Sequence, residues 1–150
     1  MRHQLHTEIV IDATPERVWE VLTDLADYHR WNPFVIESAG EVAVGQRLTN
    51  RIKPPGGRAQ TFRPIVTVAE PAVTFEWLGR LGIPGLFDGR HRFDLEPTAG
   101  GGTRLVHREF FGGLLVRFLR SSLDTRVRQG FDAMNQALKD RAESTVQVEP

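Results

Sequence analysis

The sequence contains no cysteine, which excludes disulfide bonds, thiolate catalysis and zinc–thiolate sites from the 150-residue chain. No stretch approaches the uninterrupted apolar run that a membrane-spanning helix needs. Neither sign of charge is in excess, because 19 lysine and arginine residues balance 19 acidic residues. A dedicated nucleic-acid-binding protein usually carries a basic surplus, so the composition argues against a nucleic-acid partner.

An apolar signal segment is also missing, since Met1 to Gln4 leads directly into a strand pattern. We therefore expect a soluble, cytoplasmic protein without stable membrane insertion. The length fits one domain over residues 1–150 with a substantial core, and residues 144–150 are expected to form a disordered tail. The sequence leaves the oligomeric state open.

The residues that are present predict an α+β domain. Thr14, Pro15 and Glu16 form a helix start, with a hydroxyl N-cap, a proline at the first helical position and an acid in the first turn. A second short helix is expected over 24–32, and the apolar spacing becomes helical again over 114–143. Helices that lie on one side of an antiparallel sheet make an α+β domain. Strands are expected at 3–11, 35–42, 46–53, 59–69, 72–79 and, as a hairpin, within 88–111.

The hairpin within 88–111 has an unusual inward face. Alternation along its strands directs apolar residues inward together with His91, His107 and Glu109, while its arginines face solvent. Ionisable groups on an inward face are costly unless they are partnered, so this pattern indicates a lined cavity rather than a dry core. The inward set is His91, Phe93, Leu95, Leu105 and His107, and the outward set is Arg90, Arg92, Arg104 and Arg108.

His91, His107 and Glu109 are therefore the candidate catalytic residues. Depending on the register, His91 lies opposite His107 or opposite Glu109, and residues in such positions can touch. A histidine beside a glutamate in an apolar cavity can act as a general acid/base pair or anchor a ligand. The alternative interpretation is a buried pair that satisfies its own hydrogen bonds. Strand spacing alone is poor evidence for metal binding, so no metal site and no cofactor are predicted.

The predicted ligand contacts add aromatic and apolar positions to these three residues. Aromatic side chains can form the wall of a site for a flat ligand, although core packing explains them equally well. The full predicted set is Trp31, Asn50, Phe75, Trp77, His91, Phe93, His107, Glu109, Leu119, Leu123 and Val127. The glycine-rich loop 79–89 has no phosphate-loop pattern, and together with 110–118 it is expected to cover the cavity mouth.

Several segments resemble one known family. They are Ala13–Trp19, Tyr28–Phe34, Leu86–Pro97, Gly102–Leu105 and Gly130–Lys139. Over residues 3–143 the chain is similar to the START-like or SRPBCC superfamily, which includes polyketide cyclases/dehydrases and lipid-transport proteins. The resemblance implies a helix-grip fold, in which a curved seven-stranded antiparallel sheet wraps around a long C-terminal helix and leaves a hydrophobic cavity between them. The missing cysteines exclude the iron–sulfur oxygenases of this superfamily.

We therefore expect a protein that binds a small hydrophobic or aromatic molecule between the sheet and the C-terminal helix. One alternative is a polyketide cyclase or aromatase-like enzyme that uses His91, His107 and Glu109 for proton transfer. Another is an interaction module that resembles activators of chaperone ATPases and acts through its outer surface. Apolar cavity walls do not specify one compound, so the sequence does not identify the ligand.

Overall fold

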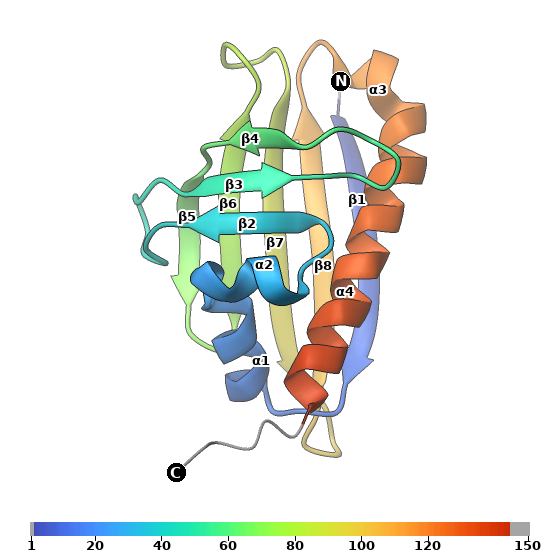
Figure 1. Ribbon diagram of the computed structural model, residues 1–150. Helices are drawn as coiled ribbons and strands as arrows, with labels where there is room; N and C mark the ends of the chain where they lie inside the picture. Colours follow the sequence, from blue (N-terminus) through green and yellow to red (C-terminus); the bar gives the residue numbers. More distant parts are fainter. Residues whose placement is uncertain (1, 145–150) are drawn as a thin grey trace.

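The computed structural model describes residues 2–144, and the tail expected at 144–150 lies outside them apart from Ser144. Figure 1 shows a small sheet and two short helices on one face of a large sheet, with a long C-terminal helix beside them. The early elements are β1 (Arg2–Ile11), α1 (Pro15–Thr23), η1 (Leu25–Asp27), α2 (Tyr28–Trp31), β2 (Val35–Ala39), β3 (Thr49–Ile52) and β4 (Gln60–Phe62). The later ones are β5 (Ile65–Glu70), β6 (Thr74–Arg80), β7 (Asp88–Pro97), β8 (Thr103–Gly112), α3 (Val116–Ser122), η2 (Leu123–Val127) and α4 (Arg128–Glu143).

The strands of the described residues form two antiparallel sheets, one of five strands in the order β1-β8-β7-β6-β5 and one of three in the order β2-β3-β4. The expectation of one seven-stranded sheet is therefore wrong in its strand count. The run predicted as one strand at 59–69 is interrupted at Arg63 and Pro64, and it contributes β4 to the small sheet and β5 to the large one. Proline has no N–H to donate to a ladder, so a strand readily ends there.

The small sheet crosses over the large one, with its strands running across the direction of β5 to β8 (Figure 1). An isolated bridge joins Arg47, in the segment between β2 and β3, to Ile65 at the start of β5. Residues of both sheets and of the C-terminal helix line one cavity in the wedge where the sheets cross. The helix runs beside the small sheet (Figure 1).

The C-terminal helix is continuous over 116–143, close to the predicted range, but its middle is not α-helical. The segment η2 is a π-helix, which has a wider turn than the α3 and α4 segments on either side of it. Beyond it, Phe131, Met134 and Leu138 are fully buried, as the predicted apolar stripe requires.

The hairpin of β7 and β8 has the predicted faces. His91, Phe93 and His107 are buried, and the register places His91 opposite Glu109 and Phe93 opposite His107. The arginines of the outer face are paired with acids on the same face. Arg90 and Arg92 contact Glu76 at 2.9 and 3.1 Å, Arg104 contacts Glu8 at 2.6 Å, and Arg108 contacts Asp94 at 2.7 Å.

Gly130 brings α4 against the chain segment that enters β2. A Cβ atom at this position would overlap Cδ1 and Cε1 of the Phe34 ring. The ring of Phe34 also packs edge-on against Phe131, with centroids 5.6 Å apart. The missing side chain of Gly130 therefore sets how closely the helix approaches the small sheet, and with it the width of the wedge.

Candidate functional site

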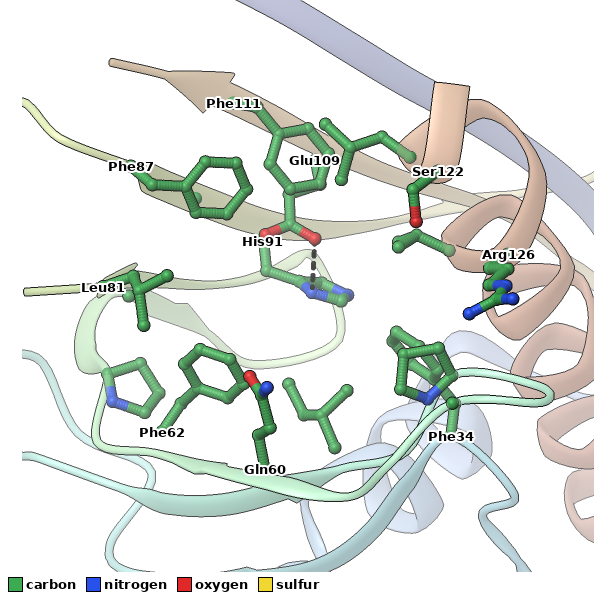
Figure 2. Close-up of a pocket in the computed structure, with 18 of the residues that line it drawn as sticks. Phe34, Gln60, Phe62, Leu81, Phe87, His91, Glu109, Phe111, Ser122 and Arg126 are labelled. Carbon is green, nitrogen blue, oxygen red and sulfur yellow. Dashed lines mark ion pairs between the residues drawn. The ribbon is translucent and has the colours of Figure 1, made fainter. Parts of the chain in front are cut away.

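A cavity of about 290 Å³ lies in the wedge between the two sheets and the middle of the C-terminal helix (Figure 2). Its walls come from β3 and β4, from the loop that follows β6, from β7 and β8, and from η2. The wall is mainly aromatic and aliphatic, which suits an apolar ligand. The apolar side chains in it are Phe34, Ile52, Phe62, Trp77, Leu81, Phe87, Phe111, Leu123 and Val127.

The predicted ligand contacts divide into two groups. The first group lines the cavity and consists of Trp77, His91, Glu109, Leu123 and Val127. The second group is not part of the cavity lining of the described chain and consists of Trp31, Asn50, Phe75, Phe93, His107 and Leu119.

The second group supports the wall from behind or lies elsewhere. Phe75 packs edge-on against Trp77 and Phe93 packs against it at a tilt, with ring centroids 5.2 and 5.6 Å away. Trp31 packs edge-on against Tyr28 in α2, and Leu119 is a partly buried residue of α3. These positions correspond to the core-packing alternative that the sequence left open.

Asn50 is fully buried in β3, where its Oδ1 accepts a hydrogen bond of 2.6 Å from the Ser38 hydroxyl. Its amide nitrogen has no hydrogen-bond partner in the structure. Alternation places Asn50 on the same face of the small sheet as Ile52, which lines the cavity. The amide nitrogen of Asn50 is therefore a donor without a partner among the described residues. It belongs to the same face of β3 as Ile52, two residues earlier in the strand.

A chain of side-chain contacts runs from the cavity wall into the helix. Oε1 of Glu109 lies 3.4 Å from Nδ1 of His91 (Figure 2), and Nε2 of His91 lies 2.5 Å from Nε2 of His107. Nδ1 of His107 lies 2.6 Å from Oδ1 of Asn135. The amide of Asn135 donates to the hydroxyl of Thr7 at 2.9 Å, and this hydroxyl donates to the backbone oxygen of His107 at 3.1 Å.

The acceptor at the inner end fixes the tautomer of both histidines. Because Oδ1 of Asn135 can only accept, Nδ1 of His107 must carry a proton. In the neutral ring Nε2 of His107 is then an acceptor, so Nε2 of His91 donates to it. Nδ1 of His91 is left with a free lone pair that faces Glu109. A protonated Glu109 completes this arrangement, since its hydroxyl can donate to that lone pair.

Burial supports the same protonation states. It raises the pKa of Glu109 to about 8, lowers the pKa of His91 to about 3 and lowers the pKa of His107 well below its usual value. His107 is enclosed by the rings of Phe93 and Phe131, with centroids 4.3 and 4.1 Å away. At neutral pH the side chains of Glu109, His91 and His107 are therefore all uncharged. Glu109 presents a neutral carboxyl to the cavity.

The sequence analysis missed Thr7 and Asn135. A signal for Asn135 was present, because an amide stands at helical spacing between Phe131 and Leu138 on the apolar stripe of the helix. Thr7 carries no comparable signal, since a threonine is ordinary in a strand. In residues 2–144 no three histidine, aspartate or glutamate side chains are grouped so that they can hold a metal ion.

The loop 79–89 and the segment 110–118 contact each other, as expected for a common cover. The N–H groups of Leu114 and Leu115 donate to the backbone oxygens of Gly85 and Leu86, at 3.1 and 3.0 Å. Their mobility stays a prediction. The loop between β3 and β4 also reaches the cavity through Pro54, Gly57 and Arg58, so the mouth has a third side.

Comparison with protein families decides the relationship of this chain. A family model described as polyketide cyclase / dehydrase and lipid transport matches residues 2–143. The chain belongs to this family. The match confirms the resemblance to the START-like or SRPBCC superfamily over almost the whole chain. Comparison with curated proteins gives no match.

Several solved structures share the fold of this chain. The Zhui aromatase/cyclase from Streptomyces sp. R1128 superposes with a TM-score of 0.80 at 18% sequence identity, covering 99% of this chain and 98% of that one. The two-domain aromatase/cyclase BexL, from the BE-7585A biosynthetic pathway, gives a TM-score of 0.77 at 18% identity. That comparison covers 95% of this chain but 50% of BexL, so the chain spans about half the length of that protein.

A third relative shows how widely the fold is shared. Protein MLL2253 from Mesorhizobium loti is 25% identical with a TM-score of 0.67, and the match covers 95% of this chain and 100% of that one. In this chain, no helix within residues 2–144 has the length and apolarity needed to cross a membrane.

Proposed function

We propose that the protein binds a small hydrophobic or aromatic molecule in the cavity between its two sheets and its C-terminal helix. The observation that carries this proposal is the composition of the wall, in which Phe34, Phe62, Trp77, Phe87 and Phe111 surround a space of about 290 Å³. Ligand sites are typically concave and apolar with a few placed polar groups, and Glu109 with His91 supplies such groups here.

The volume restricts the ligand to a small compound. It lies at the lower end of the range of about 300–1,000 Å³ for small-molecule sites. A compound of two or three fused rings, or a short acyl chain, suits this space better than a diacyl lipid. Family membership agrees with such a role, because the family description includes lipid transport as well as cyclases.

A tryptophan in place of Val127 tests this proposal. Val127 lines the cavity from η2, so the larger side chain of Val127→Trp is expected to fill part of the space and weaken binding of a neutral aromatic probe at least tenfold. N-phenyl-1-naphthylamine is suitable, because its fluorescence rises in apolar surroundings and reports binding by titration.

Gln129→Trp is the matched control, because Gln129 is an exposed residue of the same helix. The same added side chain at this position is expected to leave the dissociation constant unchanged, and circular dichroism verifies that both variants fold. Equal binding by Val127→Trp and the unaltered protein would place the probe outside the cavity and contradict the proposal.

The side-chain contacts that run from Glu109 through His91 to His107 favour a second candidate function, that of a cyclase or aromatase-like enzyme. A neutral carboxyl at the cavity wall can protonate a ligand carbonyl oxygen, and the resulting carboxylate can take a proton from the neighbouring carbon. This exchange converts a ketone into its enol, the nucleophile of an aldol ring closure. His91 can orient the carboxyl through the lone pair that faces it.

Turnover of a synthetic poly-β-ketone thioester separates the two functions. For an enzyme, we expect ring closure to be accelerated over the buffer reaction, and Glu109→Gln to lose roughly 100-fold or more of that acceleration. Glu41→Gln, which alters an exposed carboxylate, is expected to retain it. Identical product profiles with and without the protein would leave binding as the function of the cavity.

A further inference from the structure

The charged residues that line the cavity are unevenly distributed. Arg58, Arg80 and Arg126 are lining residues, and Glu109 is the carboxyl among them. The whole chain has equal numbers of basic and acidic residues, so this surplus of arginine is a local property of the cavity. A purely apolar ligand needs no basic side chains around its cavity, so these arginines indicate that the ligand carries a further chemical group.

Two of these arginines have no partner among residues 2–144. Arg80 faces Asp88 at 3.6 Å, whereas Arg58 and Arg126 form no ion pair and no side-chain hydrogen bond with any other described residue. The arginines on the outer face of β7 and β8 behave differently, since Arg90, Arg92, Arg104 and Arg108 contact carboxylates. Guanidinium groups bind carboxylates and phosphates through paired N–H donors, so unpartnered arginines at a cavity suit an anionic group.

The local backbone supports a role for Arg126. It lies in the π-helical segment η2, and Figure 2 shows its side chain directed at the cavity, on the side from which Ser122 also comes. Both residues belong to the cavity lining. Single π-helical turns inside α-helices are rare and frequently occur at functional sites. Arg58 reaches the same cavity from the loop between β3 and β4, so the two cations come from separate elements.

We propose that the ligand of this cavity is an amphipathic anion, whose apolar or aromatic body lies between the sheets and whose carboxylate or phosphate group is bound by Arg58 and Arg126. This inference rests on the proposed binding function and specifies its ligand class. The neutral carboxyl of Glu109 then contacts an uncharged polar group of the same ligand, such as a carbonyl or hydroxyl oxygen.

Two fluorescent probes test the inference, because they differ mainly by one acid group. 1-Anilinonaphthalene-8-sulfonate carries a sulfonate, and N-phenyl-1-naphthylamine has the same ring system without it. The protein is expected to bind the sulfonate at least fivefold more tightly, and the double variant Arg58→Gln/Arg126→Gln to weaken it roughly tenfold while the neutral probe is unaffected. The control is Arg51→Gln/Arg120→Gln, which removes two exposed arginines of β3 and α3 outside the cavity lining and is expected to change neither affinity.

The outcomes separate this inference from the function on which it rests. If the neutral probe binds and the Arg58/Arg126 double variant keeps the sulfonate affinity of the unaltered protein, the anion inference is overturned while the binding function stands. If neither probe binds, both fail. Competition by 2-naphthoate and by 2-naphthyl phosphate then distinguishes the two acid groups, and stronger displacement by 2-acetylnaphthalene than by either anion would also contradict the inference.

Discussion

In the variant Glu109→Gln, the free energy of unfolding is not expected to fall between pH 6.5 and pH 8.5, whereas in the unaltered protein the contribution of Glu109 to it falls by about 2 kcal/mol. The cause is the buried carboxyl, whose pKa in the folded protein is raised to about 8 from an ordinary value of 4.5. The side chain keeps 15% of its surface exposed, so most of its hydration is lost on folding.

The sign follows from proton binding. Between pH 4.5 and pH 8 the folded protein holds the Glu109 proton and the unfolded chain does not, so each rise in pH favours the unfolded chain. The stabilisation from this group is fully present below pH 4.5 and is lost as the pH rises through about 8. A glutamine keeps the shape and does not titrate, so the decline disappears.

His91 and His107 act in the opposite direction. Burial lowers the pKa of both rings, so near pH 6.5 the unfolded chain binds protons at these histidines and the folded protein does not. Stability therefore decreases below pH 6.5 in the unaltered protein and in Glu109→Gln alike. The unaltered protein is expected to be most stable near pH 6.5, where the opposing effects of Glu109 and the two histidines balance. The variant is expected to gain stability up to about pH 7.5, where the histidines of the unfolded chain have released their protons.

Urea unfolding followed by circular dichroism at pH 5.0, 6.5 and 8.5 measures these differences. Glu41→Gln, at an exposed carboxylate, is expected to follow the unaltered protein at all three values. Parallel curves for Glu109→Gln and the unaltered protein would mean that Glu109 is ionised in the folded state, and the tautomers assigned to the histidines would have to be reversed.

The second large effect is expected from Gly130→Ala, which is predicted to lower the free energy of unfolding by about 2 kcal/mol. Alanine favours a helix over glycine by about 1 kcal/mol, so the sign depends on packing. The new Cβ overlaps the Phe34 ring, which is held against Phe131 and is 3% exposed. The ring must turn or the helix must withdraw, and both changes disturb the core.

Chemical unfolding measures this loss, and Gln129→Ala at the neighbouring exposed position serves as the control with little change expected. The double variant Gly130→Ala/Phe34→Leu is expected to be more stable than the sum of the single changes predicts, because leucine releases the overlap. Phe34 also lines the cavity, so Gly130→Ala should alter probe affinity as well. An increase in the free energy of unfolding for Gly130→Ala would contradict the prediction, because it would show that the Phe34 ring moves aside without disturbing the core.

Local rules predicted the parts of this fold that depend on local sequence. Alternation along β7 and β8 assigned His91 and Arg92 to opposite faces, and the proline after Thr14 marked the start of α1 correctly. The split into two sheets was not predicted, although Pro64 was visible, because a proline in a strand run does not reveal in which direction the chain leaves the sheet.

The cavity wall depended on contacts that no local pattern contains. Phe34, Phe62 and Arg126 come from three distant segments, and they meet only because the small sheet crosses the large one beside η2. Asn135 was visible as an amide on an apolar stripe, but its contact with His107 depends on how α4 lies across β1 and β8. Predicting that placement requires the tertiary packing itself.

The pairing of the first strand with the last has a consequence for biosynthesis. β5 to β8 follow one another as neighbours in the sheet and can assemble as the chain emerges, whereas β1 pairs along its whole length with β8, from Arg2 opposite Gly112 to Ile11 opposite Thr103. β1 must therefore wait for its partner until about a hundred further residues have been made. Such long-range closure slows folding and prolongs exposure of an unpaired strand. The contact of Thr7 with Asn135 also requires α4, so the side-chain contacts that run from Glu109 to Thr7 are complete only after α4 has been synthesised.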